Sequence, residues 1–255
     1  MNTIAKFAPK CVPVAALLLL AVAAHAADRV VDLLVQPTRA KNAASMPLIA
    51  APRDDAENKI NAALRQLDGK LRKAIAACAT GAKEAHATPN WERTVEATMR
   101  GPGFLSFSIV DNTDCGGAHP NVGTMAIVYD LQTGGSVDWT KLLPAALTGK
   151  VALQEGTDGT KMVTLSSKRL TELYFAGYRN PDAECRQAMK DAAAETPPAM
   201  LAWLNAKAGG LAVKFDVAHV IQACADPVTI PSATLRQLGA SPRLVDAIDA
   251  AHGAR

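Results

Sequence analysis

Residues 105–131 read LSFSIVDNTDCGGAHPNVGTMAIVYDL and hold the clearest strand–turn–strand pattern in the chain. Leu105, Phe107 and Ile109 alternate with polar residues, which predicts a strand with one buried face. The glycine pair and the proline that follow predict a turn. A second apolar run, from 124 to 131, then predicts the returning strand. This stretch therefore indicates an antiparallel hairpin at the centre of the fold.

The segments on either side of this hairpin predict helices and further strands. Apolar residues recur at three- and four-residue steps from 54 to 78, with lysine and arginine between them, which indicates an amphipathic helix. A loop is expected at 81–90. By the same patterns we expect helices at 166–178, 181–194, 232–238 and 243–252, and strands at 29–35, 211–217 and 227–230. Strands and helices in separate blocks predict an α+β fold, a mainly antiparallel sheet packed against helices.

The expected domain organisation has three parts. Residues 1–26 are expected to form a signal peptide, residues 27–90 an N-terminal strand–helix module, and residues 91–255 an α+β domain that carries the Gly-Gly-Ala-His-Pro-Asn turn. The loop at 81–90 is the soft boundary between the last two parts. A disulfide across that loop would make them pack as one unit.

The start of the chain has the features of a secretory signal peptide. Lys6 and Lys10 make it positive, residues 12–24 are almost wholly apolar, and small residues follow at the cleavage positions. A membrane span needs about 20 apolar residues, and this run is shorter. We therefore expect cleavage after Ala26 or Ala27, and a periplasmic or secreted protein.

The charge balance of the chain argues against some classes of partner. The sequence has 27 Lys plus Arg and 24 Asp plus Glu, and without Lys6 and Lys10 the numbers are 25 and 24. No dense basic patch with interleaved aromatic residues is present, so nucleic acid is not expected as a partner. No later apolar run is long enough to span a bilayer, so no membrane span is expected after signal cleavage.

Four cysteines remain once Cys11 leaves with the signal peptide. They are Cys78, Cys115, Cys185 and Cys224, and their wide separations are unlike the spacing of zinc or redox sites. An even number in an oxidising compartment predicts two disulfides, with three possible connectivities. Because sequence neighbours close the shorter loops, we favour Cys78–Cys115 and Cys185–Cys224.

No catalytic motif is evident in the sequence. It contains no serine-hydrolase G-x-S-x-G, no S-x-x-K, no H-E-x-x-H and no phosphate-binding loop. No cofactor and no metal are expected, and no residue is assigned a catalytic role. The ligand-binding candidates are the polar residues around the predicted hairpin, namely His119, Asn121, Asp130 and Asp138.

Each of these candidates has a structural alternative. His119, between a glycine pair and Pro-Asn, could serve as a base or a ligand contact, or its ring could bond to backbone and hold the turn. Asp130 and Asp138 could flank a cleft as in glycosidases. Aspartates near turns, however, more often accept hydrogen bonds from backbone amides.

The region from 105 to 144 also resembles a known family. It combines the Gly-Gly-Ala-His-Pro-Asn element with Tyr-Asp-Leu at 129–131, Thr-Gly-Gly at 133–135 and Val-Asp-Trp-Thr-Lys-Leu-Leu at 137–143. This pattern is similar to the extracytoplasmic domain of lysozyme-sensing anti-sigma factors, which is also appended to some peptidoglycan deacetylases. Residues 209–215 and 228–231 continue the similarity.

The resemblance implies a binding domain that is not itself an enzyme. We therefore expect a non-enzymatic exported protein of the cell envelope that recognises a lysozyme-like protein or peptidoglycan. The alternative hypothesis is a cell-wall hydrolase or deacetylase that uses His119 with Asp130 or Asp138.

Overall fold

The hairpin expected around the glycine pair is present in the computed structural model, which describes residues 29–38 and 40–254. Strand β4 (Phe104–Asp114) pairs antiparallel with β5 (Asn121–Asp130), and β3 (Asn90–Arg100) pairs with the other edge of β4. The three strands form one sheet in the order β3-β4-β5. The expected signal peptide lies outside the described residues.

A second antiparallel sheet packs on the first. Its strand order is β10-β9-β8-β7-β6, and the backbone amide of Leu204 in this sheet donates to the hydroxyl of Ser106 in β4, at 3.0 Å. Because this bond is buried, the two sheets meet face to face around one core. The strands are β6 (Lys150–Glu155), β7 (Lys161–Ser166), β8 (Met200–Asn205), β9 (Gly210–Phe215) and β10 (Val228–Pro231).

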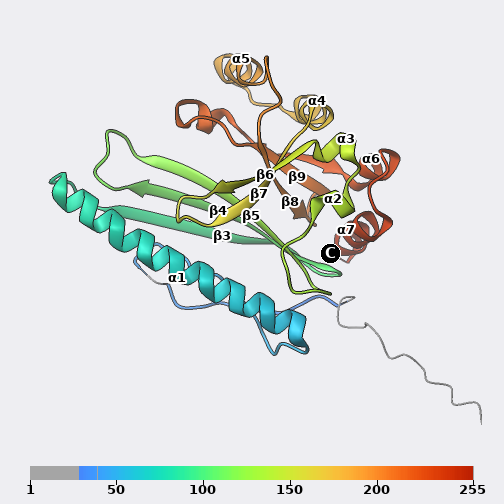
Figure 1. Ribbon diagram of the computed structural model, residues 1–255, viewed down its shortest axis with the longest axis horizontal. Helices are drawn as coiled ribbons and strands as arrows, with labels where there is room; N and C mark the ends of the chain where they lie inside the picture. The colour runs from blue at the N-terminus through green and yellow to red at the C-terminus, as the bar shows by residue number, and fades with distance from the viewer. Residues whose placement is uncertain (1–28, 39, 255) are drawn as a thin grey trace, which may run out of the picture.

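Helices cover the outer faces of both sheets (Figure 1). The long helix α1 (Asp55–Glu84) lies along the three-stranded sheet and buries an apolar stripe that includes Ile60 and Leu64. Helices α4 (Lys168–Gly177) and α5 (Ala183–Ala192) lie on the other side of the molecule. There the ring of Tyr174 stacks on Phe215 of β9 with centroids 4.1 Å apart. The layers are therefore helix, sheet, sheet and helix.

Shorter elements close the ends of these layers. Strands β1 (Leu33–Leu34) and β2 (Leu48–Ile49) form a small separate pair. The remaining helices are α2 (Trp139–Leu142), α3 (Ala145–Thr148), the 3-10 helix η1 (His219–Cys224), α6 (Ser232–Gln237) and α7 (Pro242–Gly253). The architecture confirms the predicted α+β class with antiparallel sheets.

Polar side chains of α1 hold the N-terminal segment in place. Asp54 caps the helix by accepting from the amide of Glu57 at 2.8 Å. The buried Asn61 both accepts from and donates to the backbone of Ile49, at 2.7 and 3.0 Å. These bonds satisfy the unpaired backbone of β2, so the segment before α1 joins the same core as the sheets.

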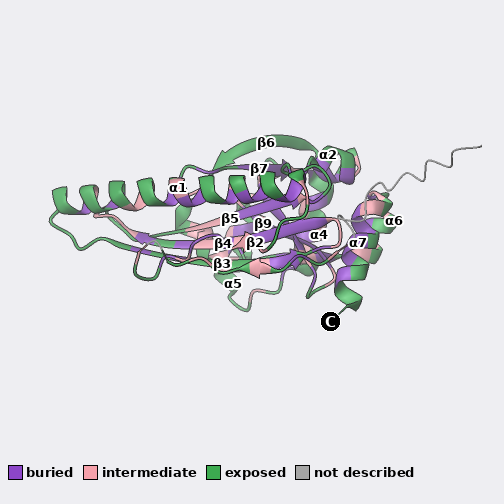
Figure 2. Cartoon of the chain, turned by 90° about the horizontal axis from the view of Figure 1, so that it is seen from below, coloured by how far each residue is buried: buried purple, intermediate pink, exposed green. Residues whose placement is uncertain are grey.

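Three local predictions differ from the structure. The predicted strand at 29–35 is only Leu33–Leu34, and the expected loop at 81–90 begins four residues late because α1 continues to Glu84. Gly81 does not break the helix; a side chain there would crowd the carbonyl oxygen of Cys115, at 3.2 Å. The hairpin of β6 and β7 and the strand β8 were not predicted, and Figure 2 shows β6 exposed along its length.

Both expected disulfides are present, with the pairing that we favoured. Cys78 of α1 bonds to Cys115 at the end of β4, and Cys185 of α5 bonds to Cys224 of η1. The first therefore fixes the end of the long helix to the β4–β5 hairpin. The second fixes η1 to the outer helical layer.

A buried ion cluster joins the two sheets. Arg93 of β3 makes two bonds to Asp111 of β4, at 2.7 and 2.6 Å, and a third to Asp158, at 2.9 Å. Asp158 belongs to the turn between β6 and β7, so this contact brings the tip of the second sheet's edge hairpin back to the first sheet. Trp91 also donates to Asp111, at 3.0 Å. All three charged side chains are almost completely buried.

This cluster makes a stability prediction. Arg93→Met should lower the free energy of unfolding by about 3–5 kcal/mol, because two buried carboxylates lose their counter-ion. Arg169→Met is the control, since Arg169 pairs with Glu172 on an exposed helix face and such pairs contribute at most about 1 kcal/mol. Urea denaturation followed by circular dichroism measures both. Equal losses in the two variants would contradict the role given to Arg93.

Candidate functional site

The Gly-Gly-Ala-His-Pro-Asn turn projects at one end of the β4–β5 hairpin. Gly116, with φ of +83°, lies so close to α1 that a Cβ there would be 2.7 Å from the Cβ of Ala85. Only glycine can combine this positive φ with so close an approach to the helix without strain. His119 and Asn121 lie beyond this contact, and both are exposed. The turn is therefore anchored at its first glycine and presents its histidine to solvent.

Asp130 lies at the opposite end of β5, where it serves the fold. Arg243 of α7 donates two hydrogen bonds to its carboxylate, each of 2.7 Å, and the guanidinium also lies over the ring of Phe104, 4.9 Å from the centroid. Burial alone would raise the pKa of Asp130, but the bonds from Arg243 and from the amide of Gln132 lower it overall. Asp130 thus fastens α7 to the hairpin as a carboxylate.

Asp138 also has a local structural role. It caps α2 by accepting from the amide and hydroxyl of Thr140, at 3.1 and 2.6 Å, and Lys141 lies 3.6 Å away. The hydrogen bond from the Thr140 hydroxyl is the main reason why the pKa of Asp138 is lowered. The expectation that aspartates near turns bond backbone amides describes both Asp130 and Asp138.

The structure does not bring the histidine and the aspartates together. His119 precedes β5 and Asp130 is the last residue of that strand. A strand rises by about 3.3 Å per residue, so the two side chains are separated by about 30 Å. Asp138 follows the same far end, where Val137 pairs with Val128 of β5. The hydrolase hypothesis needs a single centre that contains His119 and one of these carboxylates, and no such centre forms.

The structure instead places His119 beside η1. The ring nitrogen Nε2 of His219 lies 2.8 Å from the carbonyl oxygen of Pro120, so it donates to that oxygen when it carries a proton. Further along β5, the hydroxyl of Thr124 accepts a hydrogen bond from Lys214 of β9, at 2.9 Å. Side chains two residues apart share a face of a strand, so Val122 lies on the same side as Thr124. We call His119, Val122, His219 and Val220 the η1 surface.

Partly buried charges lie next to this surface. Burial lowers the pKa of Lys214, and the nearby Asp226 and Asp216 oppose that change. Burial likewise raises the pKa of Asp216, opposed by Lys214. Shifts of this kind gather at functional sites, although structural charges show them too. Sequence periodicity could not have connected Lys214 to the β4–β5 hairpin, because Lys214 and its partner Thr124 are 90 residues apart in sequence.

Two other possible features do not occur among residues 29–38 and 40–254. No group of three or more His, Cys, Asp or Glu side chains there has an arrangement that would hold a metal ion. Within the same residues, no helix has the length and apolar character needed to cross a membrane.

Comparison with known proteins gives a similarity of fold. A crystal structure of a DUF3298 family member from Bacteroides fragilis matches with a TM-score of 0.51 and 11% identity, over 80% of this chain and 85% of that protein. A DUF3298 family protein from Pseudomonas aeruginosa matches over 61% of this chain and 64% of its own, with 14% identity and a TM-score of 0.38, which is too low to establish a shared fold. No family model and no curated protein matches the chain.

The Asp130–Arg243 pair predicts a pH-dependent loss of stability. The pKa of Asp130 is lower in the folded protein than its ordinary value of 3.8. The pair therefore stabilises the fold fully at a pH above 3.8, and this contribution is lost as the pH falls through the lower pKa of the folded state. Asp130→Asn should therefore cost about 1.5–3 kcal/mol at neutral pH, and the difference from wild type should shrink in acid. Urea denaturation over a pH series measures it.

Asp138→Asn is the matched control for this experiment. Asparagine is as good a helix N-cap as aspartate, and the Asp138 side chain is half exposed, so the variant should differ from wild type much less than Asp130→Asn does, at neutral pH and in acid. If Asp130→Asn lost the same stability in acid as at neutral pH, its carboxylate charge would not be the cause.

Proposed function

We propose that this chain is a non-enzymatic binding protein that works outside the cytoplasm and recognises a lysozyme-like protein through the η1 surface. The observation that carries the proposal is the pair of exposed valines on that surface. Val122 is 41% exposed and Val220 is 87% exposed. They stand on two segments that meet where His219 contacts the carbonyl oxygen of Pro120, and exposed apolar side chains with polar neighbours are typical of sites where proteins bind one another.

The disulfides support a preformed binding surface. Cys115 lies four residues before His119 and is bonded to α1, while Cys224 ends η1 and is bonded to α5. Both segments of the η1 surface are therefore fixed to helices. A surface that is already ordered loses little conformational entropy on binding, which favours affinity. Disulfides also form and persist in oxidising compartments, in agreement with export.

The choice of ligand follows the sequence resemblance to lysozyme-sensing domains. A projecting apolar surface suits the broad face of a protein better than a sugar chain, which usually binds in a concave site. Peptidoglycan is therefore the comparison ligand in the experiment. The fold shared with a DUF3298 member is compatible with this proposal and does not identify a ligand.

The test is retention of the purified mature chain on immobilised lysozyme and on insoluble peptidoglycan. The chain should bind lysozyme, and the double variant Val122→Ser/Val220→Ser should bind at least about tenfold more weakly, because two apolar contacts are lost without a change of charge. Binding should persist at about 0.5 M NaCl, where exposed ion pairs are screened.

Val35→Ser is the matched control, since Val35 is 83% exposed on the N-terminal segment and should bind as the wild type does. Retention on neither material would remove both ligands from the proposal. Retention on peptidoglycan alone, or equal binding by the double variant, would refute recognition of lysozyme by the η1 surface.

A further inference from the structure

A separate cleft lies on the other side of β5, between α1, β5 and β7. Its volume is about 270 Å³, close to the lower limit of ordinary ligand sites. A side chain at Gly123 would point at Thr157 of the β6–β7 turn, so this face of β5 looks toward the edge hairpin and away from Val122. The cleft is therefore distinct from the η1 surface.

The floor and the rim of this cleft differ in chemistry. Ile127, Met162 and Trp139 line it and are buried, which makes the floor apolar. Lys70 of α1 and Lys161 of β7 also line it and are exposed. No aspartate or glutamate is among the lining residues that the structure describes. An apolar floor beneath two ammonium groups is complementary to an anion with a short apolar body.

The two lysines have hydrogen-bonding capacity to spare. Lys70 gives one of its three N–H donors to the carbonyl oxygen of Gly159, at 3.1 Å. Lys161 has no hydrogen-bond or ion-pair partner within residues 29–38 and 40–254. Glu155 is its cross-strand neighbour but does not line the cleft. A ligand carboxylate can therefore accept from both lysines while Lys70 keeps its bond to the hairpin.

Thr160 contributes to the wall of the cleft next to Lys161. It lines the cleft and is only 4% exposed. Its hydroxyl is fully buried and has no hydrogen-bond partner among the described residues.

We infer that the cleft is a binding site for a small amphipathic carboxylate of the fatty-acid kind, about the size of octanoate. The apolar chain lies on the floor formed by Ile127 and Met162, and the carboxylate accepts hydrogen bonds from Lys70 and Lys161. This inference does not depend on the proposed function, because it concerns different residues on the opposite face of β5.

Isothermal titration calorimetry with octanoate tests the inference on the whole mature chain. We expect a Kd on the order of 0.1 mM, as suits a ligand of this size. Acetate, which lacks the apolar chain, and octyltrimethylammonium, which reverses the charge, should each bind at least tenfold more weakly. Equal binding of the cation would refute the charge complementarity, and absence of octanoate binding at millimolar concentration would refute the site.

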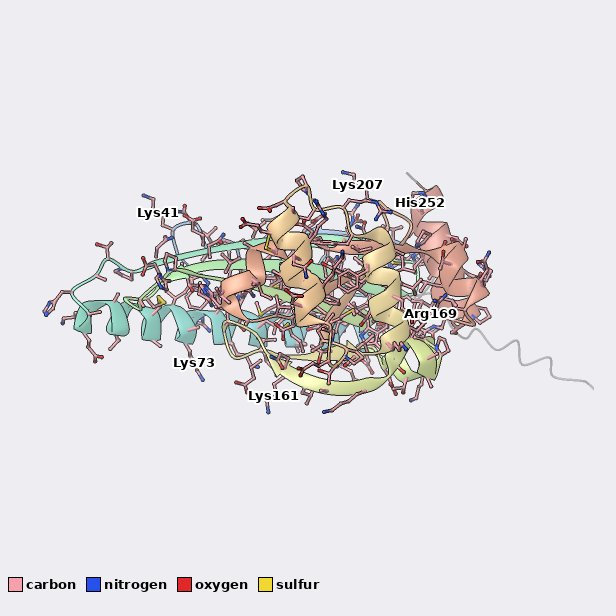
Figure 3. The ribbon with its side chains drawn as sticks, turned by 90° about the horizontal axis from the view of Figure 1, so that it is seen from above. Lys41, Lys73, Lys161, Arg169, Lys207 and His252 are labelled. Carbon is pink, nitrogen blue, oxygen red and sulfur yellow. A yellow bond between two sulfur atoms is a disulfide. The ribbon has the colours of Figure 1, made fainter. Side chains whose placement is uncertain are left out.

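Three variants locate the binding. Lys161→Gln should weaken octanoate binding about tenfold, whereas Lys207→Gln should not, since Figure 3 places Lys207 at the edge of the molecule opposite Lys161. Ala63→Met should remove binding by filling the cleft from α1, and methionine is a good helix former. Octanoate binding that survives both Lys161→Gln and Ala63→Met would place the ligand elsewhere. None of the three variants should alter retention on lysozyme. A negative result for octanoate binding can therefore be told apart from a negative result for lysozyme binding by the η1 surface.

Discussion

The buried contact of Arg93 with Asp111 and Asp158 is the constraint on which the arrangement of the sheets depends. A charge taken out of water without a partner costs several kcal/mol, so the buried Asp158 requires its bond to Arg93, which holds the turn between β6 and β7 against the first sheet. Strand β6 is an exposed edge that pairs only with β7. The ion cluster, together with the Lys70–Gly159 bond, therefore fixes the tip of a hairpin whose outer strand is exposed. That hairpin forms one wall of the cleft beside α1.

Strand β5 divides the accessible surface of the protein into two chemically different regions. The side that carries Gly123 faces the edge hairpin, and the side that carries Thr124 faces β9 and η1. This follows from the two-residue period of a strand. One side leads to a cleft with an apolar floor and a cationic rim; the other leads to exposed valines next to histidines. The predicted hairpin thus positions both candidate binding sites, although residue patterns indicated only the second.

The sequence was informative where one face of an element is buried and the other is not. The hairpin, the helices α4 to α7 and both disulfide pairings follow from alternation, periodicity and spacing. Strand β6 was missed because all six of its residues are exposed, so it has no apolar face to recognise. The partners of the polar candidates were also beyond prediction: Asp130 bonds to Arg243, 113 residues away, and His219 to Pro120, 99 residues away. Such contacts depend on the packing of elements, which local patterns do not encode.

Burial of acidic side chains changes what the nearly neutral composition implies. Among the described residues four acidic side chains are buried, Glu57, Asp68, Asp111 and Asp158, against one basic side chain, Arg93. The difference of three means that the surface is more basic than the sequence total. A cleft rimmed by lysines without a carboxylate is one local expression of this imbalance, and it favours anions. The η1 surface relies on valines instead, so its contact with a partner need not be complementary in charge. In the two proposals, charge would select the ligand on one side of β5, and apolar contact would select the partner on the other side.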